Sequence, residues 1–288
     1  MTQKHYVSET LIDGIRVSFE AERTLHEDVT SHHRMELIEN RVFGKVLLLD
    51  GAVQVTSADE FMYHEMMAHV PILAHDDPRD VLIVGGGDCG LAEEVLKHRR
   101  VRSLTQVEID PNVLDFSHKH FGEFNASVFR DERFQIEIAD GAAFVRETMA
   151  RFDVILVDST DPVGPGAALF TPAFYRDLHR CLRPDGIAVT QSGVPFLQKE
   201  DFVASIRGLG AAFDVATCYI VAVPTYFGGH LALGWASDTA SLLEVDPDIL
   251  RERAAGLATR YYTPAIHRAS FVLPGYIAEA VEQADRGR

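Results

Sequence analysis

The stretch that decides the fold reads Val81-Leu82-Ile83-Val84-Gly85-Gly86-Gly87-Asp88-Cys89-Gly90. Four apolar residues lead into three glycines, and residues 91–99 then have the composition of a helix. A short, continuous apolar run of this kind is typical of a strand buried on both faces of a parallel sheet. Glycines at a strand-to-helix turn let the backbone approach a ligand closely, near the positive end of the helix. The stretch therefore predicts a turn that binds a nucleotide or a nucleoside.

Asp88 narrows the choice of ligand. Gly85, Gly87 and Gly90 match the G-x-G-x-x-G spacing of dinucleotide-binding turns. A pyrophosphate on this turn would meet the carboxylate of Asp88, and like charges at contact range repel by about 1 kcal/mol even in water. Asp88 thus disfavours nicotinamide cofactors and ATP, and it favours a sulfonium nucleoside of the S-adenosylmethionine type with an amine on its tail. The alternative is a structural turn in which Asp88 is merely solvated.

Strand and helix patterns alternate along the rest of the chain. Strands are predicted at 81–84, 103–109, 134–138, 152–157, 186–191, 215–223 and 230–236, and helices at 91–99, 111–121, 142–150, 172–182 and 199–210. Repeated units of this length predict a doubly wound α/β fold with a mostly parallel, Rossmann-like sheet of seven strands, of the methyltransferase type. The last two strands are separated only by 224–229 and should pair antiparallel. The tail from Pro247 should be helical and pack on the sheet.

Residues 1–57 are expected to form a separate small β domain. Runs with β character at 17–20, 34–39 and 45–49 are punctuated by glycines, which predicts a small antiparallel sheet. Residues 58–73 then have a helical pattern whose apolar side is rich in methionine. We place the domain boundary after residue 57, so that 58–288 form a Rossmann-like, nucleoside-binding catalytic domain.

The composition limits the partners. The 288 residues are 47% hydrophobic, which is enough for a sizeable core, and the net charge is −16. An acidic protein repels nucleic acid and anionic membranes but attracts cations into an acidic cleft. The three cysteines are too scattered for a disulfide framework or a zinc cluster. Because neither a membrane-spanning apolar run nor a signal-peptide pattern is visible, we expect a cytoplasmic protein.

Carboxylates follow four successive predicted strands: Asp88, then Glu108 and Asp110, then Asp140, then Asp158 and Asp161. The carboxyl ends of parallel strands meet at one edge of a sheet, where ligands bind. Glu108, about twenty residues beyond the glycine turn, is placed to accept hydrogen bonds from ribose hydroxyls. Asp140-Gly141 suits the amino group of adenine. Any one of these acids could instead cap a helix, and Asp110, which precedes a proline, is best interpreted as a cap.

A second strong feature is the segment Asp158-Ser159-Thr160-Asp161-Pro162-Val163-Gly164-Pro165. Two carboxylates lie three residues apart in a loop stiffened by prolines, and their repulsion and partial burial should raise the pKa of at least one. Such a patch can hold an alkyl-ammonium ion and accept its proton. The proton must leave because an amine is not nucleophilic until it has lost it. A turn that only caps the helix at 172 is the alternative, and the second acid argues against it.

These motifs are joined by Leu49-Asp50-Gly51-Ala52-Val53-Gln54, Asp59-Glu60-Phe61-Met62-Tyr63-His64-Glu65-Met66 and Pro224-Thr225-Tyr226-Phe227-Gly228-Gly229. Together they resemble the polyamine aminopropyltransferases, specifically the spermidine synthases, over nearly the whole chain. The resemblance implies decarboxylated S-adenosylmethionine as donor and putrescine as acceptor, giving spermidine and 5′-methylthioadenosine by direct displacement. It implies no metal and no separate cofactor. A homodimer or homotetramer is expected.

The resemblance also implies a role for each matching residue. Asp158 would accept the proton, and Asp161 would hold the acceptor amine. The implied diamine site consists of Tyr63, His64, Asp88, Asp158, Asp161 and Tyr226. The implied donor site consists of His33, Gln54, Gly85, Gly87, Asp88, Glu108, Asp140, Gly141 and Pro165.

Two positions depart from the pattern of the family. His33 stands where the family usually has Gln, so donor affinity or its pH dependence should differ. Cys89 follows the loop aspartate where the family commonly has Gly. Its side chain is expected to narrow the space beside the donor and to need an unusual backbone angle.

Other chemistries fit the sequence less well or remain as alternatives. The segment His64-Glu65-Met66-Met67-Ala68-His69 is similar to the H-E-x-x-H zinc motif, but its histidines are five apart and face different sides of a helix. There is no G-x-S-x-G elbow of a serine hydrolase. An S-adenosylmethionine-dependent amine N-methyltransferase and a non-catalytic polyamine-binding protein remain as alternatives. The sequence leaves open whether the acceptor is putrescine, cadaverine, agmatine or spermidine.

Overall fold

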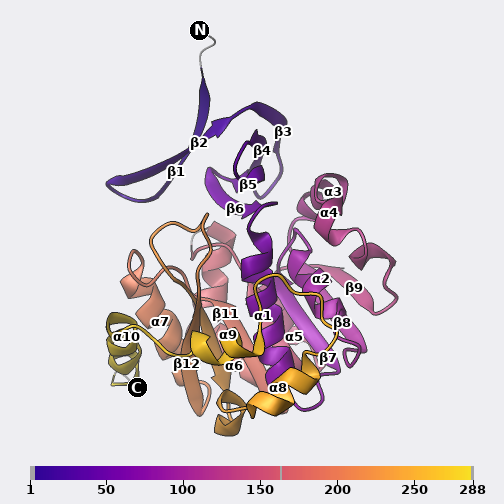
Figure 1. The fold of residues 1–288 in the computed structure, drawn as a ribbon, viewed down its shortest axis with the longest axis vertical. Helices are drawn as coiled ribbons and strands as arrows, with labels where there is room; N and C mark the ends of the chain where they lie inside the picture. The colour runs from indigo at the N-terminus through magenta and orange to yellow at the C-terminus, as the bar shows by residue number, and fades with distance from the viewer. Residues whose placement is uncertain (1–3, 163, 287–288) are drawn as a thin grey trace.

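The computed structural model describes residues 4–162 and 164–286, in which a seven-stranded sheet carries two smaller antiparallel sheets at one end (Figure 1). The strands are β1 (His5–Ile12), β2 (Ile15–Ala21), β3 (Arg23–Val29), β4 (Arg34–Asn40), β5 (Gly44–Leu49), β6 (Ala52–Thr56), β7 (Asp80–Gly85), β8 (Ser103–Glu108), β9 (Phe134–Ile138), β10 (Phe152–Asp158), β11 (Leu182–Gln191), β12 (Val215–Val221) and β13 (Leu231–Ser237). The helices are α1 (Glu60–Ala74), α2 (Gly90–Leu96), α3 (Pro111–His120), α4 (Gly122–Asn125), α5 (Gly141–Glu147), α6 (Pro172–Cys181), α7 (Lys199–Gly210), α8 (Pro247–Arg253), α9 (Pro264–Ser270) and α10 (Gly275–Asp285), with 3₁₀ turns η1 (Val128–Arg130), η2 (Gly164–Phe170) and η3 (Ala240–Leu243).

The large sheet has the predicted doubly wound topology. Its strand order is β12-β13-β11-β10-β7-β8-β9, in which β11, β10, β7, β8 and β9 run parallel. The last two strands pair antiparallel with each other, and β13 pairs antiparallel with β11, as expected from their short connection. The direction of winding reverses between β7 and β10, which leaves a crevice at the carboxyl ends of these two strands.

Successive side chains of the central strands point to opposite faces of the sheet, and this divides the hydrophobic core into two layers. Val81 and Ile83 of β7 pack with α1 and α2 on one face, whereas Leu82 and Val84 pack with α6 and α7 on the other. Nearly all of α1 is buried, which is why its apolar residues do not form a single stripe. This helix passes from the N-terminal sheets down one face of the central sheet (Figure 1).

The N-terminal residues form two antiparallel sheets, where a single one was predicted. The four-stranded sheet β3–β6 is apolar on both faces. One face, with Leu37 and Leu47, packs against α3, and the other, with Ile38 and Val46, packs against the β1–β2 hairpin. Because both faces are buried, the hairpin forms its own layer rather than extending the sheet. The domain boundary after residue 57 stays a prediction.

The tail is helical, as predicted, but it packs less on the sheet than on helices. The carboxylate of Glu65 on α1 accepts backbone N–H bonds from residues 260, 261 and 262 at 2.7–2.8 Å. Helix α9 contacts β12, whereas α8 packs on α1 and α10 on α7. No helix in 4–162 or 164–286 is long and apolar enough to cross a membrane.

Candidate active site

The glycine turn of the opening stretch approaches the end of β10 very closely. Gly85 and Gly86 have φ of 87° and 67°, which glycine adopts without strain. A Cβ atom on Gly85 would lie 2.1 Å from the carbonyl oxygen of Asp158, and the N–H of Gly86 donates to that same oxygen at 2.9 Å. The turn therefore brings Asp88 and Asp158 to the same crevice, where the winding of the sheet reverses.

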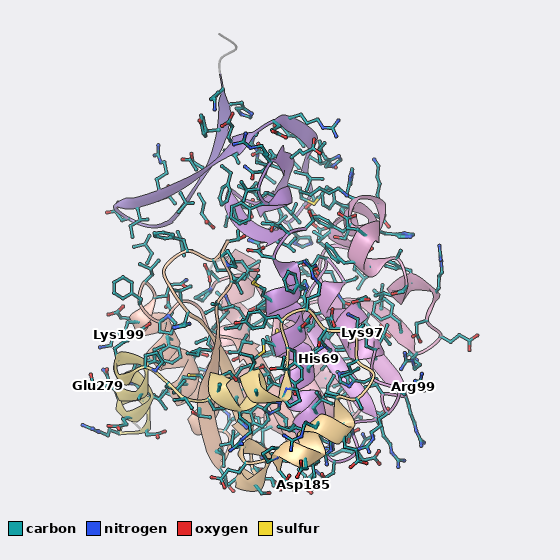
Figure 2. All side chains as sticks on the ribbon, viewed as in Figure 1. His69, Lys97, Arg99, Asp185, Lys199 and Glu279 are labelled. Carbon is teal, nitrogen blue, oxygen red and sulfur yellow. The ribbon has the colours of Figure 1, made fainter. Side chains whose placement is uncertain are left out.

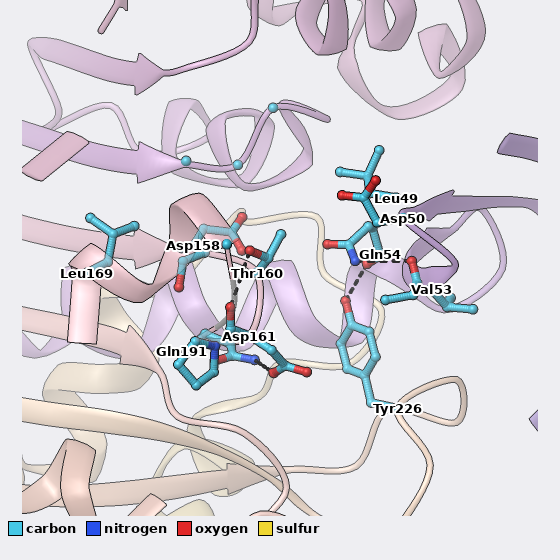
Figure 3. Close-up of a pocket in the computed structure, with 18 of the residues that line it drawn as sticks. Leu49, Asp50, Val53, Gln54, Asp158, Thr160, Asp161, Leu169, Gln191 and Tyr226 are labelled. Carbon is cyan, nitrogen blue, oxygen red and sulfur yellow. Dashed lines mark hydrogen bonds between the residues drawn. The ribbon is translucent and has the colours of Figure 1, made fainter. Parts of the chain in front are cut away.

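A cavity of about 800 Å³ opens at this crevice, between the central sheet and the N-terminal strands (Figure 3). Its volume falls within the range of pockets for small molecules. The sequence-predicted residues that line it are His33, Gln54, Tyr63, His64, Gly85, Gly87, Asp88, Glu108, Asp140, Gly141, Asp158, Asp161 and Tyr226. The side chain of Pro165 lies outside the part of the chain that the structure describes.

Asp158 is held by a tyrosine and has a raised pKa. The hydroxyl of Tyr63 on α1 donates to its Oδ1 at 2.7 Å. Burial and then the charge of Asp88 raise the pKa of Asp158 to about 6, although His64 and Tyr63 act against this rise. The sequence predicted a raised pKa from partial burial and from repulsion between Asp158 and Asp161, and burial is indeed the larger cause. The repelling neighbour is instead Asp88, and Asp161 lies 3.4 Å from the amide nitrogen of Gln191.

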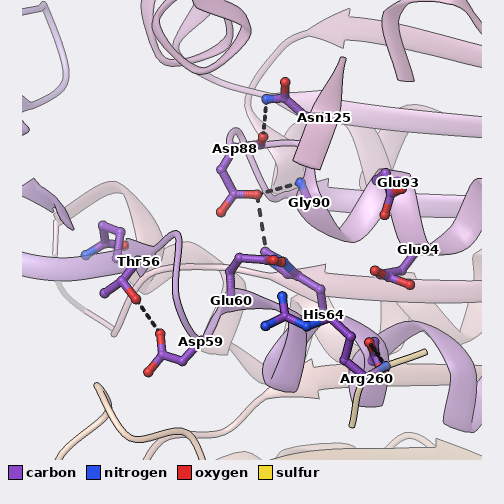
Figure 4. Close-up of polar contacts among 12 residues, drawn as sticks. Thr56, Asp59, Glu60, His64, Asp88, Gly90, Glu93, Glu94, Asn125 and Arg260 are labelled. Carbon is purple, nitrogen blue, oxygen red and sulfur yellow. Dashed lines mark hydrogen bonds and ion pairs between the residues drawn. The ribbon is translucent and has the colours of Figure 1, made fainter. Parts of the chain in front are cut away.

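His64 lies between two carboxylates (Figure 4). Its Nδ1 is 2.8 Å from Oε2 of Glu60, and its Nε2 is 3.6 Å from Oδ1 of Asp88, while the side chain is only 2% exposed. Burial by itself would lower the pKa of His64, but Asp88 and Glu60 together raise it well above the usual value. The sequence analysis missed Glu60, which could have been found from its spacing of one helical turn before His64.

The second tyrosine of the site comes from the loop between β12 and β13. The hydroxyl of Tyr226 donates to the carbonyl oxygen of Gln54 at 2.6 Å, and its ring stands at 88° to that of Tyr63 with centroids 5.9 Å apart. Asp59, at the start of α1, accepts hydrogen bonds from the N–H and the hydroxyl of Thr225. Asp59, which the sequence analysis also missed, thereby fixes the tyrosine-bearing loop to α1.

The acids at the ends of β8 and β9 differ in their roles: Glu108 lines the cavity, Asp110 caps a helix, and Asp140 does both. Glu108 is buried, accepts the N–H of Asp110 at 3.0 Å, and has its pKa raised by burial. Asp110 caps α3 by accepting the N–H of Asn112, which confirms the prediction for this residue. Asp140 caps α5 in the same way through the N–H of Ala143, and it also lines the cavity.

His33 and Cys89, the two residues that depart from the family pattern, lie in different surroundings. His33 lines the cavity, and its Nδ1 lies 2.9 Å from Oδ2 of Asp50. Cys89 has φ of 61°, which confirms the predicted backbone angle. The predicted narrowing beside the donor is wrong, because Cys89 is fully buried in the core and is not among the cavity-lining residues. The left-handed backbone conformation turns this side chain inward.

Glu9 is a further cavity residue that the sequence analysis missed. This residue of β1 accepts the N–H of Val53 at 3.0 Å, and burial followed by the charge of Asp161 raises its pKa. No motif singles it out, because only the packing of the hairpin over β6 brings it to the cavity. Glu9 and Asp161 form an acidic end of the cavity.

His69 lies on α1, like His64, but it is buried in the interior and is not among the cavity-lining residues (Figure 2). Its ring nitrogens face Nε2 of His98 at 2.9 Å and Oε2 of Glu94 at 3.1 Å. His64 and His69 therefore point to different surroundings, as their five-residue spacing predicts. In 4–162 and 164–286 no group of three or more His, Cys, Asp or Glu side chains is placed to hold a metal ion.

The doubly wound fold and the acidic cavity at its crevice are those expected of a nucleoside-dependent transferase. Comparisons with known proteins specify the class. Residues 60–246 match the model of the spermine/spermidine synthase domain, and residues 5–57 match that of the spermidine synthase tetramerisation domain.

Relatives match over nearly the full length. A polyamine aminopropyltransferase of a Ruegeria species is 48% identical, over 96% of this chain and 98% of its own. The Escherichia fergusonii enzyme of that name is 46% identical, with 98% of both chains covered. A solved spermidine synthase in complex with the transition-state analogue AdoDATO superposes with a TM-score of 0.92 at 33% identity, with 98% of both chains covered.

The chain belongs to the spermine/spermidine synthase family, and it is an enzyme that transfers aminopropyl groups. Decarboxylated S-adenosylmethionine, the aminopropyl donor, is a substrate of this reaction rather than a cofactor. Both points confirm predictions made from the sequence motifs.

Proposed function

We propose that this enzyme transfers the aminopropyl group to putrescine and forms spermidine and 5′-methylthioadenosine. The observation that carries the proposal is the placement of Asp88 and Asp158 in one cavity, where Tyr63 and His64 of α1 contact them. Two carboxylates at this point suit two cations, the ammonium of the donor tail and the amine of the acceptor. The neighbour solved with a transition-state analogue supports a ternary arrangement of this kind.

In the proposed reaction the acceptor nitrogen attacks the propyl carbon that is bonded to sulfur. The new C–N bond forms as the C–S bond breaks, the electron pair goes to sulfur, and 5′-methylthioadenosine leaves. Asp158 takes the proton from nitrogen. A free primary amine has a pKa near 10, so desolvation beside the sulfonium must lower it toward the raised pKa of Asp158, about 6. Alignment of the two substrates supplies the rest of the rate increase.

We propose the following roles for the residues at the donor and acceptor ends of the cavity. We assign ribose to Glu108 and adenine to the region of Asp140, because both line the cavity beyond the glycine turn. Asp161 and Glu9, at the acidic end, would hold the distal ammonium of the diamine. This assignment favours an acceptor with two cationic ends.

The test is an incubation of the pure protein with each donor and a panel of amines. We expect decarboxylated S-adenosylmethionine with putrescine to give spermidine and 5′-methylthioadenosine, with slower turnover of cadaverine, agmatine and spermidine. S-adenosylhomocysteine as the product from intact S-adenosylmethionine would instead identify an amine N-methyltransferase. Tight diamine binding without turnover would identify a non-catalytic binding protein.

The pH profile gives a separate prediction. Because Asp158 acts as a base only when ionised, kcat/KM should fall as the pH drops below about 6. The hydrogen bond from Tyr63 lowers the pKa of Asp158, so Tyr63→Phe should move this acid limb to higher pH. Initial rates between about pH 5 and 9 measure both effects.

Tyr175→Phe is the matched control, because this buried tyrosine bonds Ser205 in the layer of α6 and α7. It should leave the acid limb in place. An acid limb that stays in place in Tyr63→Phe would contradict the role of the Tyr63 hydroxyl.

The oligomer is likewise a proposal. We infer assembly as a homotetramer, or a homodimer, through the N-terminal sheets, and the match of residues 5–57 to a tetramerisation domain supports it. Division into a β domain at 1–57 and a catalytic domain at 58–288 is proposed on the same grounds. A cytoplasmic location stays a prediction from the sequence.

A further inference from the structure

The two ring nitrogens of His64 are held unequally. Nδ1 lies 2.8 Å from Oε2 of Glu60, which is an ordinary hydrogen-bond length. Nε2 lies 3.6 Å from Oδ1 of Asp88, which is too long for a good hydrogen bond and leaves mainly the attraction between charges. That oxygen already accepts the N–H of Gly90 at 2.7 Å. The proton on Nε2 is therefore held more weakly than the proton on Nδ1.

The surroundings of His64 nevertheless favour its charged form while Asp88 has no other cation. Four titratable groups lie around it, namely Glu60 and Tyr63 on α1, Asp88 in the glycine turn and Asp158 at the end of β10. The ring of Phe124 on α4 and the backbone of Gly90 also lie near it. Of the charged side chains in 4–162 and 164–286, only His64 forms an ion pair with Asp88. The raised pKa of His64 is consistent with this arrangement.

We propose that His64 is a displaceable counter-cation, which releases its Nε2 proton when the ammonium group of the donor binds at Asp88. The inference rests on the proposed function, which places that ammonium there. The N–H bond at Nε2 breaks, its electron pair stays on nitrogen, and the proton passes to solvent or buffer. Beside Asp88 the ammonium brings one positive charge and the departing proton removes one, so the charge next to this carboxylate is conserved, while the sulfonium of the donor adds its own charge elsewhere in the cavity.

Repulsion between two cations on one carboxylate is the driving force. An imidazolium and an ammonium would both point N–H groups at Asp88, and the His64 side chain is only 2% exposed, so solvent does little to screen the two charges from each other. Once neutral, the ring keeps its Nδ1–H bond to Glu60, and the lone pair on Nε2 becomes an acceptor for the ammonium. His64 thereby changes from a competitor of the donor to one of its ligands.

Proton release can be measured by titration calorimetry at about pH 8, in Tris and in phosphate, which differ strongly in ionisation enthalpy. At this pH Asp158, with a pKa of about 6, is already ionised, and the ammonium of the donor stays charged, so neither group is a large source of protons. We expect the binding heat of decarboxylated S-adenosylmethionine to differ between the buffers by an amount that corresponds to as much as one proton. The product 5′-methylthioadenosine, which lacks the amine, should bind with the same heat in both.

His64→Gln supplies the matched variant, because it keeps a hydrogen-bonding side chain that cannot titrate. It should bind the donor with equal heats in the two buffers, whereas Asp158→Asn should still release the proton. If His64→Gln does not fold, the two-buffer comparison on the unaltered enzyme still decides whether donor binding releases a proton, and Asp158→Asn still excludes Asp158 as its source. Donor binding with equal heats in both buffers would overturn this inference and leave the proposed function standing. An absence of donor binding would overturn both.

Discussion

Asp158→Asn should lower kcat by about 10²–10⁴-fold, the usual contribution of a general base. The amide oxygen can still accept the hydrogen bond from Tyr63, so the geometry of the site should survive the change. What disappears is the group that takes the proton of the attacking amine. Affinity for the donor nucleoside should change by only a few fold, because ribose and adenine are assigned to other residues.

The prediction is checked by single-turnover rates together with equilibrium binding of 5′-methylthioadenosine. Asp161→Asn is the matched control, since it makes the same chemical change three residues later in the same loop. Asp161 lies beside Gln191 and toward Glu9, so this variant should raise KM for the diamine more than it lowers kcat. A nearly normal kcat in Asp158→Asn would remove Asp158 from the role of base.

The parts of the fold that the sequence predicts are those specified by local patterns. The apolar run at 81–84 is buried on both faces of the sheet, as its lack of alternation requires. The parallel direction of the central strands follows from the repeated units, and the antiparallel pairing of the last two follows from the short 224–229 connection, whereas the order of the strands in the sheet is known only from the structure. The two layers of the N-terminal region are less predictable, because β4 and β5 are apolar on both faces and do not indicate which layer the hairpin joins.

The site shows the same division between local and long-range information. Carboxylates at strand ends are visible in the sequence because parallel topology brings them to one edge. Their electrostatic coupling is not visible: sequence proximity pairs Asp158 with Asp161, whereas the fold pairs it with Asp88. Glu9 and Asp59 are further cases, since each reaches the site through a contact that spans many residues.

The second large effect is expected for Asp88→Asn, which should weaken binding of the decarboxylated donor far more than binding of 5′-methylthioadenosine. Removal of one partner of a largely buried charge pair costs about 2–5 kcal/mol, or about 30- to 4,000-fold in affinity. The side chain of Asp88 is only 14% exposed, so solvent cannot replace it. The product lacks the ammonium and should bind the variant within a few fold of its normal affinity.

The ratio of the two affinities is the measurement that matters, because it cancels any general disturbance of the glycine turn. Asp140→Asn serves as the control at another strand end: it should weaken both ligands together, since both carry adenine. Asp88→Asn should also lower the pKa of Asp158, because the charge of Asp88 is one of the causes that raise this pKa. The acid limb of the pH profile of Asp88→Asn should therefore shift to lower pH. Equal losses of affinity for donor and product would show that Asp88 shapes the turn rather than recognising the amine.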